Sequence, residues 1–216
     1  LKGKFDDSMF DSETGLLRKT EKEAAATVLE DMKHVNPKFG KPGYDTNCVM
    51  CTSTMELRRR GFNVEAGAEM TGNGIFEDEA ELMWNDAAGK VRKYSKLESM
   101  GAYFDATGFH QNTPESYRKE TLDTLASHGP GARGELNVVW KRGFGGHSMF
   151  WENDANGNTT VYCTQTGRTF SGESLDKLLA TTRSNTNRRL DDCNPVISEM
   201  ANHKIFSDSQ LKRLRK

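Results

Sequence analysis

The stretch YDTNCVMCTSTMELRRRGFNVEA, residues 44–66, is the most distinctive part of this chain. Two cysteines, Cys48 and Cys51, lie three residues apart and directly after Asn47. Asp, Thr and Asn are common caps at the start of a helix, and a glycine such as Gly61 commonly ends one. The stretch therefore predicts a helix that begins at or next to Cys48.

A cysteine at a helix start is a candidate nucleophile. The helix dipole and the free backbone N–H groups of the first turn favour its thiolate, and a thiolate nucleophile needs a histidine within hydrogen-bond reach. Among the five histidines, His147 has the most suggestive setting, because the glycines of RGFGGHSMFWE lead directly into a predicted strand. An early Cys followed by a later His is the chain order of papain-like enzymes.

A C-x-x-C pair has other readings. Zinc binding needs two further ligands, and Cys163 and Cys193 could serve, but neither belongs to a second close pair. A thioredoxin-type redox site needs a βαβ context, which the sequence does not predict here. Buried, inert cysteines are the remaining alternative. We expect no metal and no cofactor.

The wider pattern predicts an α+β domain, with helices first and a sheet after them. Three aromatic and β-branched segments, GELNVVWK, HSMFWEN and TTVYCTQ, predict an antiparallel meander, with NDANGN as the last turn. We expect helices over residues 13–34, 48–60, 76–86, 114–129, 172–183 and 195–204, and further strands over 62–66 and 187–192.

Composition narrows the function classes. The chain has 216 residues, 35% hydrophobic and 28% charged, with a net charge of -1. Binding to nucleic acid needs a basic excess or face, so we expect no nucleic-acid partner. No apolar run approaches the roughly 20 residues that span a bilayer, so we expect no membrane span. No signal peptide is visible, and the start on Leu1 suggests a fragment of a longer polypeptide.

The stretch NCVMCTSTMELRRRGFNVEA resembles the N-C-x-x-C-x-x-x-x-E-x-R-R-x-G signature of the papain-fold toxin family. Such domains occur at the C-termini of bacterial polymorphic toxins and in phage head-morphogenesis proteins. The lead-in VNPKFGKPGYDTN also matches. Downstream, GGHSMFWENDANGNTTVYCTQTGRTF resembles the second block of the family, which is G-H, a hairpin and then D-x-Q-x-G.

The resemblance implies a papain-like fold, in which N-terminal helices carry the Cys on a helix start and pack on an antiparallel sheet that carries the His. On this basis we expect an N-terminal helical segment (1–35), a papain-like catalytic domain (36–206) and a basic tail (207–216).

The resemblance also implies site residues. Cys48 takes the nucleophile position and His147 the base position. The D-x-Q of the family appears here as Cys163, Thr164 and Gln165, so a thiol stands where an acid is expected. A neutral thiol orients an imidazole poorly compared with Asp.

Three accounts of this departure are open. Gln165 takes the orienting role, or another acid such as Asp154 or Asp191 reaches the imidazole, or the site is weakened or repurposed. We favour a working Cys48–His147 pair with Gln165 nearby.

Other residues of the two blocks have more than one interpretation. The backbone N–H of Cys48 and a side-chain donor, Asn47 or Thr46, are the oxyanion candidates. Cys51 is the alternative nucleophile if the helix begins later. The arginines of ELRRRG, residues 58–60, are expected to be a solvated helix end, with a partner- or substrate-binding patch as the alternative.

The function implied by the resemblance is that of a toxin domain, a cysteine hydrolase that deamidates a glutamine of a target-cell protein. The alternatives are a protease or acyltransferase of the same fold, or a non-catalytic interaction domain of a phage head protein. The family also implies a cognate immunity protein, delivery of this effector as part of a larger polypeptide, a prophage or similar source, and action in the target-cell cytoplasm.

Overall fold

The computed structural model describes residues 7–69, 75, 77–98, 115–142, 145–202 and 206, and the chain forms two compact units. The first unit contains the residues up to Met83, the short segment Thr164–Gly167 and the residues from Pro195 onward. The second contains Trp84–Cys163 and Arg168–Asn194. The described part of the predicted N-terminal segment 1–35 therefore belongs to the same unit as Cys48.

The first unit is helical. Its elements are η1 (Asp7–Met9), α1 (Glu21–Ala24), α2 (Val28–Lys33), α3 (Cys48–Arg59), α4 (Glu77–Glu81) and α7 (Ile197–Asn202). The single helix predicted over residues 13–34 is wrong. Thr20 and Thr27 each open a new short helix with a capping box, in which the threonine side chain and a glutamate three residues later bond each other's backbone N–H. Two helix starts within eight residues break the expected helix into α1 and α2.

Helix α3 confirms the helix predicted from Cys48. Its residues from Met50 to Arg58 are all buried, and Gly61 follows its end with a φ of 96°, a conformation that glycine adopts without strain. The strand predicted over 62–66 is wrong, because Phe62 and Ala66 form only isolated bridges, with Arg18 and Phe206 respectively.

A buried ion cluster joins the N-terminal part of the first unit to the end of α3. The carboxylate of Asp31 is fully buried and pairs with Lys19 Nζ at 2.5 Å, Arg58 Nε at 3.2 Å and Arg59 Nη1 at 3.3 Å. Burial lowers the pKa of Arg58, and the charge of Asp31 opposes that shift. The expectation of a solvated helix end is therefore wrong for Arg58.

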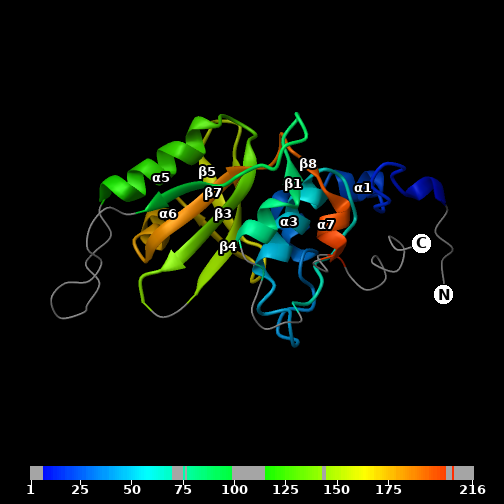
Figure 1. Cartoon of the computed structure of the whole chain (residues 1–216), viewed down its shortest axis with the longest axis horizontal. Helices are drawn as coiled ribbons and strands as arrows, with labels where there is room; N and C mark the ends of the chain where they lie inside the picture. The colour runs from blue at the N-terminus through cyan, green and yellow to red at the C-terminus, as the bar shows by residue number, and fades with distance from the viewer. Residues whose placement is uncertain are drawn as a thin grey trace. The chain divides into compact units, whose positions relative to one another are not determined.

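The second unit is built on a six-stranded antiparallel sheet with the order β2-β7-β3-β4-β5-β6 (Figure 1). Its strands are β2 (Ser95–Glu98), β3 (Arg133–Trp140), β4 (Gly146–Asn153), β5 (Thr159–Cys163), β6 (Arg168–Ser171) and β7 (Thr182–Arg189). The predicted meander is confirmed as β3, β4 and β5. Two short strands, β1 (Trp84–Asn85) and β8 (Asn194–Pro195), lie where the chain passes from one unit to the other.

Helices α5 (Glu115–Ser127) and α6 (Gly172–Leu179) cover one face of this sheet. The core between them contains residues from both helices and from the three meander strands: Leu125, Leu136, Val138, Met149, Trp151, Val161, Leu175 and Leu179. The α+β class expected from the sequence is thus confirmed. Among the described residues, no helix has the length and apolar character needed to cross a membrane.

Candidate functional site

Cys48 is the first residue of α3, and it is half-buried, whereas Cys51, Cys163 and Cys193 are buried. The side chain of Asn47, at the N-cap position, makes no capping hydrogen bond to α3, and the first turn contains no acidic residue. The local structure therefore gives Cys48 a helix N-terminus whose dipole favours negative charge. It is the cysteine best exposed to a reactant.

Asn47 is instead the centre of a buried amide cluster. Its Nδ2 donates to Asn36 Oδ1 at 3.2 Å and to the carbonyl of Gly67 at 2.9 Å. Its Oδ1 accepts from Asn36 Nδ2 at 3.3 Å and from Gln165 Nε2 at 3.4 Å. Asn36 Nδ2 also donates to the carbonyl of Gln165 at 3.3 Å. This cluster fixes the residue directly before Cys48.

The cluster changes the interpretation of two sequence candidates. An amide nitrogen has two N–H groups, and both of those on Asn47 are used within the cluster, so Asn47 is a poor oxyanion donor. Thr46, which is exposed, and the backbone N–H of Cys48 remain as candidates. Asn36 was not predicted as part of the site, although it lies in the VNPKFGKPGYDTN lead-in.

Cys51 has the features of a core residue. It is fully buried, and its thiol donates to Asn47 Oδ1 at 3.4 Å. Burial favours Cys48 over Cys51 as the nucleophile. Within the described parts of the chain, no group of three or more His, Cys, Asp or Glu residues is placed to hold a metal ion.

In the second unit, His147 lies near the start of β4, opposite Val138 of β3. Its Nε2 is 2.9 Å from Cys163 Sγ, and its ring stacks on Trp140 with a centroid distance of 6.4 Å and an interplanar angle of 22°. The preceding Gly146 permits this close strand pairing, because a Cβ there would lie 2.3 Å from the carbonyl oxygen of Val138. The predicted base and the thiol at the expected acid position are thus hydrogen-bonded.

The two alternative acids have other partners. Asp154 accepts from the backbone N–H groups of Asn156 and Asn158 in the β4–β5 turn. The hydrogen bond from the Asn158 backbone is the main cause that lowers the pKa of Asp154. Burial raises the pKa of Asp191, but hydrogen bonds from Arg189 and from the Arg133 backbone outweigh it, and the net shift is downward. The structure gives both carboxylates roles in the local framework.

A second buried polar cluster lies on the same sheet. Glu135, fully buried, accepts hydrogen bonds from Ser148 Oγ at 3.0 Å, Tyr94 Oη at 2.8 Å and Arg188 Nε at 3.0 Å. Burial, followed by the charge of Glu135, raises the pKa of Tyr94 well above its usual range. Because Glu135 has a partner for both of its oxygens and none of its surface is exposed, this cluster is structural.

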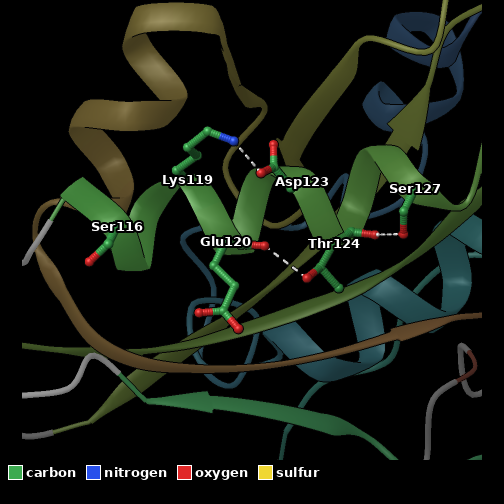
Figure 2. A pocket seen from close by; sticks show the side chains of 6 residues that line it. All are labelled: Ser116, Lys119, Glu120, Asp123, Thr124 and Ser127. Atoms are coloured by element: carbon green, nitrogen blue, oxygen red, sulfur yellow. Dashed lines mark hydrogen bonds and ion pairs between the residues drawn. The ribbon is translucent and has the colours of Figure 1, made fainter.

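Figure 2 shows an open pocket along the outer face of α5. Its lining residues all come from that helix: Ser116, Lys119, Glu120, Asp123, Thr124 and Ser127. Several of these groups bond one another, including Lys119 Nζ with Asp123 Oδ2 at 2.5 Å and Thr124 Oγ1 with the Glu120 carbonyl at 2.8 Å. None of the predicted site residues lines this pocket, and its groups belong to the solvated face of the helix.

No protein-family model matches the chain, and no curated protein matches it significantly.

Proposed function

We propose that this chain is a cysteine-dependent hydrolase of protein side-chain amides, with Cys48 as the nucleophile and His147 as the base. The observation that carries the proposal is the hydrogen bond between His147 Nε2 and Cys163 Sγ, at 2.9 Å. A catalytic imidazole is typically contacted by a side chain on the nitrogen remote from the nucleophile, and Cys163 makes that contact, although a thiol does not favour the basic tautomer as an aspartate does. The proposal therefore assigns proton exchange with Cys48 to Nδ1.

Two further observations support the assignment of Cys48. It is the least buried of the four cysteines, and it begins a helix of 12 residues. The amide cluster of Asn36, Asn47 and Gln165 holds the backbone just before it. A nucleophile held on a rigid element keeps its geometry better than one on a loop.

In the proposed reaction, the His147 tautomer with a bare Nδ1 takes the proton of the Cys48 thiol, and the thiolate attacks the carboxamide carbon of a glutamine side chain. The backbone N–H of Cys48 donates to the oxyanion that forms. The C–N bond then breaks, and the leaving ammonia takes the proton from His147. Water, activated by the same imidazole, hydrolyses the thioester, giving a glutamate and the free thiol.

The papain-like fold, the identity as a toxin domain, delivery into a target cell and a cognate immunity protein belong to the same proposal. Their support is the resemblance of the two sequence blocks. Growth arrest on expression of the wild-type chain, absent for Cys48→Ala, is the expected result for a toxin. Equal growth of both strains would point to the non-catalytic alternative.

The reaction itself is tested on an N-blocked glutaminyl-glycine dipeptide and on unfolded casein as probes. Deamidation releases ammonia and adds about 1 Da to each modified glutamine. We expect both signals for the wild-type chain and for Cys193→Ala, the matched control, because Cys193 is a buried residue outside the proposed site. Cys48→Ala and His147→Ala should each lose at least about 100-fold in rate.

Other outcomes separate the alternatives. Casein fragments without a mass gain would indicate a protease, and amine incorporation in place of water would indicate an acyltransferase. Alkylation of Cys48 at neutral pH tests the pair directly. If the alkylation rate is the same in wild type and His147→Ala, His147 is not the base for Cys48.

A further inference from the structure

In the hydrogen bond between Cys163 and His147, either the thiol or the imidazole nitrogen can be the donor. A neutral imidazole has one protonated nitrogen, which donates, and one bare nitrogen, which accepts. Nε2 is the atom 2.9 Å from Cys163 Sγ. If the thiol donates, Nε2 is bare and the ring proton is on Nδ1. If the sulfur accepts, the proton is on Nε2.

The surroundings of Cys163 favour a donating thiol. Its side chain is 5% exposed and belongs to the apolar core of the second unit, with Met149, Val161 and Leu175 in the same cluster. A charged thiolate is costly in such surroundings. A neutral sulfur is only a weak acceptor, whereas an imidazole nitrogen accepts well, so the S–H points to Nε2.

We propose that Cys163 is a positioning residue that holds His147 in the tautomer with the proton on Nδ1. The Trp140 ring, stacked on the imidazole, restrains the ring plane and with it the nitrogen that faces Cys163.

The catalytic consequence rests on the proposed function. An aspartate in place of Cys163 would accept from Nε2–H and leave Nδ1 bare, as a base must be. A thiol donor has the opposite effect and places the proton on the nitrogen that is assigned to Cys48. Cys163 therefore keeps His147 in its less reactive form, and Cys163→Asp should increase the reaction rate.

Nitrogen NMR of the full chain tests the tautomer without any assay of activity. The His147 resonances are assigned by their loss in His147→Gln. In wild type we expect a pyridine-like Nε2 and a pyrrole-like Nδ1, and in Cys163→Asp the reverse, or both nitrogens pyrrole-like if the carboxylate stabilises the imidazolium. Cys193→Ser, the control, should leave the spectrum of His147 unchanged, because Cys193 bonds the Arg189 carbonyl instead.

If the buried carboxylate prevents Cys163→Asp from folding, Cys163→Ala tests the tautomer of His147 instead. With the thiol removed, the Nε2 resonance should move from the pyridine-like position toward the mean of the two tautomers. A pyrrole-like Nε2 in wild type, alone or together with a pyrrole-like Nδ1, overturns the proposal. So does a spectrum that is the same in wild type and Cys163→Ala.

Ammonia release from the glutaminyl dipeptide, measured on the same samples, separates the two proposals. We expect Cys163→Asp to raise kcat by about tenfold or more over wild type. A tautomer change without ammonia release from any variant supports the role of Cys163 and counts against the deamidase. Ammonia release that is unchanged by Cys163→Asp, with the tautomer reversed, also counts against His147 as the base.

Discussion

A buried thiol beside an imidazole behaves differently from a carboxylate in the same place. The carboxylate accepts and stays charged, whereas in the proposed arrangement the Cys163 thiol, buried in an apolar core, donates. The sequence predicted the residue types at this contact, since both blocks were visible as motifs. It could not predict that Cys163, rather than Gln165, bonds Nε2, because that depends on how β4 and β5 pair.

The four thiols should differ in reactivity. Burial raises the pKa of Cys193 to about 11, so at pH near 8 its thiol is neutral as well as enclosed. With iodoacetamide, we expect Cys48 to be alkylated at least about tenfold faster than Cys193 in the folded protein. Peptide mass spectrometry over a time course measures both rates. The difference should vanish in denaturant, and equal rates in the folded protein would contradict the structure.

His128 should make the fold sensitive to acid. Burial, aided by the charge of Arg189, lowers its pKa, and its ring stacks on Trp151 at 5.5 Å. The His128 imidazole therefore binds a proton more readily in the unfolded chain than in the folded one. Its contribution to the free energy of unfolding is complete above the unfolded pKa of about 6.5 and is lost as pH falls through the folded pKa. In urea unfolding, His128→Phe should lose less stability than wild type between about pH 7.5 and 5. An equal loss in both proteins would exclude His128 as the cause.

Among the elements, those set by local signals were predictable and those set by distant partners were not. Helix α3 carries its own stop at Gly61, and the strands of the meander carry their own turn residues. The break between α1 and α2 was also visible, as Thr20 with Glu23 and Thr27 with Glu30, but the apolar spacing suggested one helix. Burial of Arg58 was not visible, because its partner Asp31 lies 27 residues away.

The Asp31 cluster gives a prediction for the first unit. Asp31→Asn leaves the buried cations Lys19 and Arg58 without their carboxylate, and we expect a loss of about 3–5 kcal/mol in the free energy of unfolding. The matched control is Asp123→Asn, which removes an exposed pair with Lys119 on α5 and should cost less than about 0.5 kcal/mol. Chemical denaturation measures both. Equal losses would show that the buried cluster does not stabilise the fold.

At the scale of the whole molecule, the order of residues along the chain does not indicate how it is divided into two compact units. The first unit is assembled from three separate segments, one of which is only Thr164–Gly167. The amino-acid composition does not change at the positions where the chain passes from one unit to the other. The bounds predicted for the helix over 172–183 and the strand over 187–192 are wrong, because α6 ends at Leu179 and β7 runs from Thr182 to Arg189. The TRSNTNRR sequence of β7 is polar, and its burial depends on partners such as Tyr117 and Thr121, which bond Asn185.

The last strand of the large sheet has a consequence for solubility. In the described part of the chain, β6 pairs only with β5, so its outer edge presents backbone groups that could join another sheet. Arg168, exposed on this strand, places its guanidinium over the Phe170 ring at 5.3 Å. We expect Arg168→Val to increase self-association in light scattering, and Lys177→Val, which removes the same charge from α6, to leave it unchanged. A single arginine then acts as a gatekeeper that keeps neighbouring molecules from extending one another's sheets into fibrils.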